Sequence, residues 1–207
     1  MNRPTFEIED GLPGPAIGID EAGRGCLAGP VAAAAAFINR EKFPAETLAR
    51  IQDSKTLSER QREEIFDEMA ALPRDTFAYA FATADAGRID ETNILAATME
   101  SMREAGLKLA REIPGAHYII DGNRAPNLPN AVCAVKGDSR SYSVAAASIV
   151  AKVIKDRTLK SLGREYPQFD FARHKGYGTA AHMAELAKYG PTPLHRKTYA
   201  PVRKYAQ

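Results

Sequence analysis

The chain contains few cysteines, no tryptophan and no long hydrophobic run. Two of its 207 residues are cysteines, Cys26 and Cys133, and they form neither a disulfide framework nor the spacing of a metal site. We therefore expect both to be small buried side chains in a cytoplasmic protein. No apolar run approaches the roughly 18 residues of a membrane span, and the polar, proline-containing residues 1–15 do not resemble a secretory signal.

The net charge is only +2, but the charges are unevenly distributed along the chain. Residues 1–151 contain 16 basic and 22 acidic residues, whereas residues 152–207 contain 12 basic and 4 acidic ones. A basic segment of this kind is typical of a protein that meets a polyanion such as nucleic acid, and it is also common for solubility alone. Charge by itself leaves both interpretations open.

Hydrophobic patterning predicts an α/β order of elements without an internal repeat or a domain break. The expected strands are residues 16–20, 76–83, 117–121 and 131–135, and the expected helices are residues 58–72, 93–113, 141–162 and 179–188. The run VAAAAAFI at residues 31–38 is ambiguous. Consecutive alanines favour a helix, while a buried strand running back from a glycine turn fits equally well.

Several carboxylates stand at the ends of the expected elements. Asp20 and Asp121 end two strands, Glu21 follows Asp20, and Asp138 follows a glycine. Because ligand sites form beyond the carboxyl ends of strands in open α/β sheets, we expect Asp20, Glu21 and Asp121 in one cleft. Clustered carboxylates need protons or cations, and oxygen ligands suit Mg²⁺ or Mn²⁺ and phosphoryl chemistry. The alternative is that these acids only cap helices and turns.

The glycine turn after the first strand has two interpretations. Residues 23–28 (GRGCLA) formally match the Gly-x-Gly-x-x-Gly/Ala dinucleotide fingerprint. The preceding Asp20 and Glu21 would face a pyrophosphate, however, and Gly29-Pro30 interrupts the expected entry into a helix. Glycines on both sides of Arg24 also let the backbone approach a sugar-phosphate surface closely.

The basic C-terminal third offers an aromatic contact. In residues 173–178 (RHKGYG), Tyr177 stands between two glycines and beside potential cations. Tyrosine commonly stacks on a sugar or base in nucleic-acid sites, and a structural loop with a buried tyrosine is the alternative. We interpret His182 as structural. Lys152 and Asp156 share one helix face, where they either line the cleft or form a surface ion pair.

Several sequence blocks together resemble bacterial ribonuclease HII, in order from about residue 16 to residue 202. The blocks are Asp20–Gly25 (DEAGRG) with Gly29-Pro30, Asp53–Lys55 (DSK), Ile120–Gly122 (IDG), Lys136–Asp138 (KGD), Ala146–Val153 (AASIVAKV) with Lys155–Arg157 (KDR), His174–Thr179 (HKGYGT), and Gly190-Pro191 with His195-Arg196. The related ribonuclease HIII carries a different turn after its Asp-Glu pair and an additional N-terminal domain, for which this chain has no room.

The resemblance implies an α/β, ribonuclease H-like fold, in which a mixed five-stranded sheet is flanked by helices and followed by a small helical C-terminal part. Residues 1–207 would form a single catalytic domain, with the core at about 16–165 and a substrate-binding part at about 166–207. On this view residues 31–38 are a strand. Many family members continue as a helical extension beyond the His-Arg block, whereas this sequence stops at Gln207.

The resemblance also implies a metal-dependent endoribonuclease that acts on RNA–DNA hybrids and on single ribonucleotides embedded in duplex DNA. Cleavage on the 5′ side of the ribonucleotide would leave a 3′-hydroxyl and a 5′-phosphate. The family's four catalytic carboxylates, which would hold two Mg²⁺ or Mn²⁺ ions with substrate bound, correspond to Asp20, Glu21, Asp121 and Asp138. A non-catalytic protein that binds RNA–DNA junctions is the alternative.

Substrate contacts follow from the same blocks. The expected contacts are Gly23, Arg24 and Gly25 at the 2′-hydroxyl, Tyr177 on the sugar at the junction, and Lys55, Lys152, Lys175 and Arg196 at phosphates. We assign Asp156 a supporting structural role. The family precedent is a monomer without a membrane partner, and recruitment by a replication clamp is left open.

Overall fold

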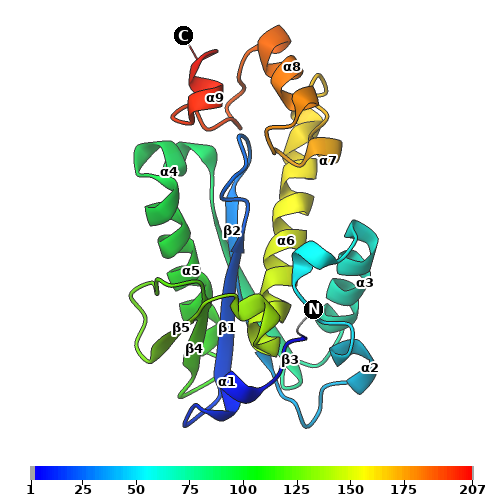
Figure 1. Ribbon diagram of the computed structural model, residues 1–207, viewed down its shortest axis with the longest axis vertical. Coiled ribbons are helices and arrows are strands. Elements are labelled where there is room, and N and C mark those ends of the chain that lie inside the picture. Colours follow the sequence, from blue (N-terminus) through cyan, green and yellow to red (C-terminus); the bar gives the residue numbers. More distant parts are fainter. Residues whose placement is uncertain (1–2, 207) are drawn as a thin grey trace.

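The computed structural model describes residues 3–206 and is built around a mixed five-stranded sheet (Figure 1). Its strands are β1 (Ala16–Ala22), β2 (Val31–Ile38), β3 (Phe77–Ala84), β4 (His117–Asp121) and β5 (Ala131–Ala134). Their order in the sheet is β3-β2-β1-β4-β5. The first three strands pair antiparallel, whereas β4 runs parallel to β1 and β5 runs parallel to β4. The expected mixed five-stranded sheet is therefore confirmed.

Helices pack on both faces of this sheet and beyond one of its ends (Figure 1). They are α1 (Glu7–Asp10), α2 (Ala45–Leu48), α3 (Glu59–Ala70), α4 (Ala86–Glu91), α5 (Ile94–Ala110), α6 (Tyr142–Leu162), α7 (Phe171–His174), α8 (Ala180–Tyr189) and α9 (Ala200–Arg203). Short 3-10 turns occur at Ser54–Thr56, Gly137–Ser139 and Gly163–Glu165. Within residues 3–206, no helix is both long enough and apolar enough to cross a membrane.

The four helices expected from the sequence are α3, α5, α6 and α8, and each begins at a side-chain cap. The caps are Ser58, Asn93, Ser141 and Thr179, whose side-chain oxygens accept a hydrogen bond from the backbone N–H three residues later. At Ser58 the side chain of Gln61 bonds back to the cap, which completes a capping box. These polar residues define where each helix starts because they satisfy N–H groups that the helix leaves free.

Residues 31–38 form strand β2, so the helix that alanine propensity favours does not form. β2 pairs with β1 on one side and β3 on the other, and its alanines are buried. Ala33 and Ala35 pack in the core cluster on the α5 side of the sheet, while Ala34 and Ala36 pack in the cluster with α3 and α6. The small side chains let both helix layers approach, and this burial outweighs intrinsic helix preference.

Helix α6 crosses β1 in direct contact with the backbone of Gly18. A Cβ added at Gly18 would lie 2.1 Å from the carbonyl carbon of Ser143 and 2.3 Å from the backbone nitrogen of Val144. Only glycine permits this approach. Side chains alternate along a strand, so Asp20 lies on the same face of the sheet as Gly18 and faces the α6 layer.

The C-terminal segment packs against one end of the sheet and of α6 (Figure 1). Leu27 in the β1–β2 connection and Leu159 in α6 form a core cluster with Phe169, Phe171 and Val202. This arrangement confirms the expected small helical C-terminal part. The boundary between a core at about 16–165 and a substrate-binding part at about 166–207 stays a prediction.

The two cysteines differ in burial. Cys26 is buried, whereas Cys133 is exposed. The expectation of two buried cysteines is therefore wrong for Cys133. The reason is topological, because β5 lies at the edge of the sheet and is paired only with β4.

We predict that Gly18→Ala strongly destabilises the protein, because the added methyl group would overlap the backbone of α6. Overpacking of this kind typically costs about 1–3 kcal/mol, and rigid backbone on both sides should place this variant at or above the upper end. Gly11→Ala is the matched control, since its Cβ would meet nothing closer than 3.5 Å. Urea denaturation of both variants measures the difference, and equal stabilities would contradict the packing described for Gly18.

Candidate active site

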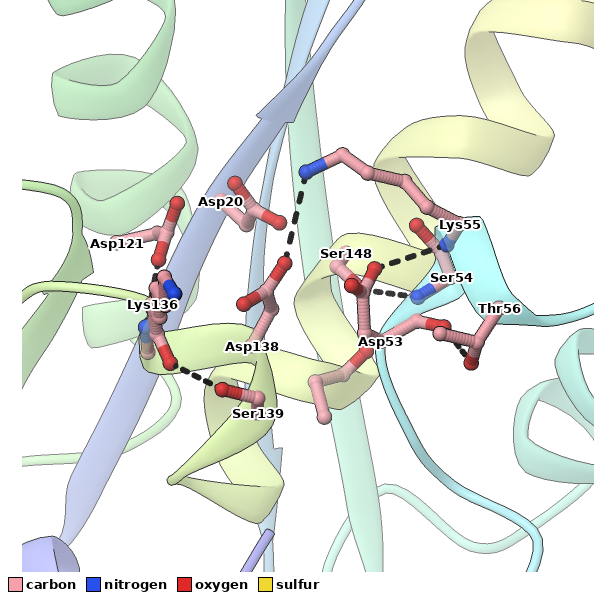
Figure 2. Close-up of polar contacts among 12 residues, drawn as sticks. Asp20, Asp53, Ser54, Lys55, Thr56, Asp121, Lys136, Asp138, Ser139 and Ser148 are labelled. Atoms are coloured by element: carbon pink, nitrogen blue, oxygen red, sulfur yellow. Dashed lines mark hydrogen bonds and ion pairs between the residues drawn. The ribbon is translucent and has the colours of Figure 1, made fainter. Parts of the chain in front are cut away.

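The predicted carboxylates gather at the carboxyl ends of β1 and β4 (Figure 2). The parallel register pairs Ile19 with Ile120, so the next residues, Asp20 and Asp121, follow side by side on neighbouring strands. Asp121 ends β4, whereas β1 continues two residues beyond Asp20, to Ala22, so the expected strand end at Asp20 is wrong. Asp138 comes from the 3-10 turn Gly137–Ser139 that precedes α6. The structure thus brings these aspartates, which are distant in sequence, together at the carboxyl ends of neighbouring strands, as the sequence predicts.

Backbone N–H groups fix two of these carboxylates. Asp20 Oδ1 accepts a hydrogen bond of 2.7 Å from the N–H of Glu21, and Asp121 Oδ1 accepts one of 2.7 Å from the N–H of Gly137. Gly137 lies so close that an added Cβ would be 3.3 Å from Asp121 Oδ1. The Lys136–Asp138 turn therefore brings its own carboxylate next to the end of β4.

The electrostatics of the cluster reflect its crowding. Burial, followed by the charges of Glu21 and Asp121, raises the pKa of Asp20 well above its usual range. Burial also raises the pKa of Glu21, and the nearby Arg24 offsets part of that rise. The pKa of Asp138 is raised by burial and then by repulsion from Asp53 and Asp121. Each of these carboxyls therefore gains from a cation placed among them.

Two side-chain cations already face the cluster. Lys55 Nζ lies 3.6 Å from Asp138 Oδ2, and Arg24 Nη1 lies 3.3 Å from Glu21 Oε1 (Figure 2 shows the first pair). Burial lowers the pKa of Lys55, but attraction to Asp20 and Asp138 outweighs it and raises this pKa overall. The amino group of Lys55 is thus held as a cation at the mouth of the site.

The donor chemistry of this cluster fits a hard divalent cation. Within residues 3–206, no three His, Cys, Asp or Glu side chains enclose an ion as they stand. Mg²⁺ is, however, usually held by only one or two carboxylates together with water and substrate phosphate oxygens, so the protein does not have to surround the ion alone. Asp20 and Asp121 offer carboxylate oxygens on adjacent strands, and burial followed by the neighbouring acids raises the pKa of Asp20. Such oxygen donors suit a hard divalent cation that also keeps water and substrate ligands.

A cleft of about 220 Å³ opens beside the carboxylates. Its walls contain eight of the predicted site residues: Asp20, Glu21, Gly23, Arg24, Gly25, Lys55, Lys152 and Tyr177. A larger hollow of about 430 Å³ lies along α5, but it is lined by Leu107 and long charged side chains without an acidic cluster. The chemistry therefore belongs to the smaller cleft.

Tyr177 also lines the cleft and is 39% exposed. The ammonium groups of Lys155 and Lys152 lie 4.7 Å and 5.2 Å from the centre of its ring. Asp156 binds both ammonium groups, at 2.6 Å and 2.9 Å. Lys152 thus lines the cleft and pairs with the buried Asp156, which supports the cations beside Tyr177.

Comparison with known proteins identifies the family. Residues 17–202 match the family model described as Ribonuclease HII. The chain is 47% identical over 203 residues to the ribonuclease HII of Paramagnetospirillum magneticum, and the match covers 98% of both chains. This chain belongs to the ribonuclease HII family. It is accordingly a ribonuclease H, an endonuclease that hydrolyses phosphodiester bonds.

Solved structures have the same fold. Ribonuclease H2 from Pyrococcus horikoshii matches with a TM-score of 0.68 and 25% identity, over 92% of this chain and 96% of that one. Bst-RNase HIII, solved in complex with Mn²⁺, matches with a TM-score of 0.71 and 22% identity, over 93% of this chain and 69% of that one. The second likeness concerns the fold alone.

The basic residues expected at phosphates divide into two groups. Lys55 and Lys152 line the cleft, whereas Lys175 lies outside its walls and pairs with Glu59 at 2.7 Å. Arg196 is fully buried and donates only to backbone carbonyls and a tyrosine hydroxyl. The interpretation of Arg196 as an exposed phosphate contact is therefore wrong.

Sequence reasoning missed Lys155 and Tyr199 as parts of this region. Lys155 belongs to the KDR block that carries the family resemblance, so the block itself could have indicated it. Tyr199 stands in a proline-rich basic tail without a local pattern, and only the three-dimensional structure brings its hydroxyl to the glycine turn.

A buried histidine network holds the backbone beside Tyr177. The Thr192 N–H donates to His195 Nδ1 at 3.0 Å, and the two Nε2 atoms of His195 and His182 lie 2.9 Å apart. His182 Nδ1 lies 2.9 Å from the carbonyl oxygen of Tyr177. These partners assign the tautomers: His195 donates through Nε2, and His182 donates through Nδ1. His182 is thus structural, as expected from the sequence.

We predict that the free energy of unfolding falls as the pH drops from about 6.5 to about 4. Burial, and then the neighbouring His182, lower the pKa of His195 from 6.5 to about 4. The unfolded chain takes up a proton near its ordinary imidazole pKa, while folded His195 does not, so acid favours unfolding. The difference is on the order of 3 kcal/mol at 1.36 kcal/mol per pKa unit. Denaturation of the native protein and His195→Gln across this range measures it, and equal pH slopes would contradict the assignment.

Proposed function

We propose that this ribonuclease H cleaves the RNA strand of RNA–DNA hybrids and single ribonucleotides embedded in duplex DNA. Cleavage lies on the 5′ side of the ribonucleotide and leaves a 3′-hydroxyl and a 5′-phosphate. The observation that carries the proposal is one cleft in which Asp20 and Glu21 lie with a glycine turn and an aromatic side chain, while Asp121 and Asp138 are near enough to Asp20 to raise its pKa in addition to burial. Family membership supports the endonuclease activity.

Asp20, Glu21, Asp121 and Asp138 are the residues that would hold divalent ions. The Mn²⁺ complex of the related HIII enzyme supports a divalent cofactor, and Mg²⁺ is equally suited to these oxygen donors. Two ions held there would supply activation of the attacking water and stabilisation of the leaving 3′-oxygen. The protein's own part is to hold Asp121 through the Gly137 N–H and to keep Lys55 beside Asp138.

We assign recognition of the ribose to the glycine turn and Tyr177. Gly23, Arg24 and Gly25 expose backbone to the cleft and would meet the 2′-hydroxyl, the group that separates RNA from DNA. Tyr177 would stack on the sugar at the RNA–DNA junction, with its ring supported from beneath by Lys155. Lys55 and Lys152 would contact neighbouring phosphates.

The other functions considered fit less well. The segment after the glycine turn is strand β2, so no helix N-terminus faces the turn as a dinucleotide site requires. A binding protein without activity does not agree with membership of an enzyme family whose four carboxylates are all present. A monomeric state, cytoplasmic location and recruitment by a replication clamp stay predictions.

The proposal is tested with a DNA duplex that contains one ribonucleotide. We expect cleavage 5′ of that ribonucleotide only when Mg²⁺ or Mn²⁺ is added. Asp121→Asn should lower the rate by about 100-fold or more, because the loss of several kcal/mol of metal-derived stabilisation has that effect. The amide oxygen can still accept the Gly137 hydrogen bond, so this variant should fold. Asp10→Asn is the exposed control, and metal-independent cleavage would refute the proposal.

We predict that Tyr177→Ala mainly reduces activity on the single-ribonucleotide duplex. Loss of one aromatic–sugar contact is worth about 1–3 kcal/mol, and long hybrids present many alternative positions that do not contain a junction. The measurement is the ratio of kcat/KM on the two substrates. Tyr189→Ala is the matched control, since Tyr189 is similarly exposed at 48% but lies on α8. Equal losses on both substrates would count against recognition of the junction.

A further inference from the structure

Arg196 is the largest fully buried side chain in the structure, and its surroundings are unusual for a charged group. Its guanidinium donates through Nε to Gly29 O (3.2 Å), through Nη1 to Arg24 O (2.8 Å) and Tyr199 Oη (3.1 Å), and through Nη2 to Gly23 O (2.7 Å) and Gly29 O (3.0 Å). All five N–H donors are thus used on uncharged acceptors. A buried charge is expensive unless its hydrogen bonds are complete, so this arrangement serves the turn that it binds.

Tyr199 completes the arrangement. Its hydroxyl accepts a hydrogen bond from Arg196 and donates one of 2.9 Å to the carbonyl oxygen of Arg24. The guanidinium also lies 5.2 Å from the centre of the Tyr199 ring. The carbonyl of Arg24 is therefore held by two donors, and both come from the C-terminal segment next to α9.

The direction of these carbonyls determines the direction of the adjacent N–H groups. The described chain has no cis peptide bond, and in a trans peptide the N–H of the next residue points away from the carbonyl. Because the carbonyls of Gly23 and Arg24 point toward Arg196, the N–H groups of Arg24 and Gly25 point away from it. No backbone acceptor within residues 3–206 receives either N–H.

Residues 23–25 line the cleft, while Arg196 is buried beneath them. Gly23 has a φ of +95°, a backbone conformation that glycine adopts readily, and an added Cβ there would lie 2.9 Å from the carbonyl oxygen of Pro30. The positive charge of Arg196 also polarises both peptide groups, which strengthens their N–H groups as donors. The two N–H groups therefore form a prepared donor pair on the substrate side of the turn.

We propose that Arg196 and Tyr199 are positioning residues that orient the Arg24 and Gly25 N–H groups toward the ribose hydroxyl of the substrate. This inference rests on the proposed function of the cleft. Its specific content is that discrimination between ribonucleotide and deoxyribonucleotide depends on two residues that never touch the substrate.

The test compares Tyr199→Phe and Arg196→Lys with the native protein. The first variant removes the hydroxyl and both of its hydrogen bonds, the one donated to Arg24 O and the one accepted from Arg196. The second keeps the charge but loses the planar five-donor fork. Affinities are measured with Ca²⁺ for two duplexes that differ only in one ribonucleotide or deoxyribonucleotide. The quantity compared is the affinity for the ribonucleotide duplex divided by that for the deoxyribonucleotide duplex. We expect this ratio to fall about 3- to 10-fold in Tyr199→Phe, as the loss of the hydrogen bond to Arg24 O implies, and further in Arg196→Lys.

A merely structural role would lower thermal stability or weaken both duplexes equally and leave the ratio unchanged. An unchanged ratio in folded Tyr199→Phe would overturn the proposal, and this variant decides the matter alone if Arg196→Lys does not fold. The amide NMR signals of Arg24 and Gly25 should also shift in Tyr199→Phe without substrate. Arg203→Lys in α9 is the matched control, because it makes the same arginine-to-lysine change at an exposed position.

If the native protein fails to cleave a single-ribonucleotide duplex with metal, the proposed function fails, whatever the variants do. If it cleaves normally and the affinity ratio is unaffected by the variants, only the positioning role fails. The two outcomes are therefore separate.

Discussion

The parallel pairing of β1 with β4 is the constraint on which the catalytic region depends. It places Asp20 and Asp121 side by side on adjacent strands, where burial and mutual repulsion act on carboxyls that unpaired chain segments would keep apart. Helices cover both faces of the paired strands. α5, in the connection between β3 and β4, packs on one face, and α6 packs against Gly18 on the other. Crowded charge at this edge is thus a product of sheet topology.

The C-terminal segment stabilises the part of the cleft formed by the glycine turn and Tyr177. Its histidines bind the backbone beside Tyr177, its hydrophobic residues pack on Leu27 and Leu159, and its arginine binds the glycine turn from beneath. The basic character of this segment therefore has mixed origins. Lys175 pairs with Glu59 outside the cleft, and Arg196 is enclosed within the protein.

Much of this organisation could be predicted from local sequence. Helix starts at Ser58 and Asn93 follow from capping chemistry, and the strand ending in Asp121 follows from its apolar run. Residues 31–38 could not be assigned by propensity, since their conformation depends on pairing with two strands that are distant in sequence. The burial of Arg196 was equally inaccessible, because a basic residue in a polar tail shows its acceptors only after the tail has folded back. Exposure of Cys133 required knowledge of the strand order.

The contact between Arg196 and the Gly23 carbonyl joins residues near the two ends of the sequence. During synthesis from the N-terminus, all four acidic residues have been added once Asp138 is in the chain, well before Arg196 and Tyr199 are added. A nascent chain of that length contains the acidic residues but lacks Arg196 and Tyr199, whose side chains bind the carbonyls of the glycine turn. The contacts that hold this turn are therefore among the last that the growing chain can form.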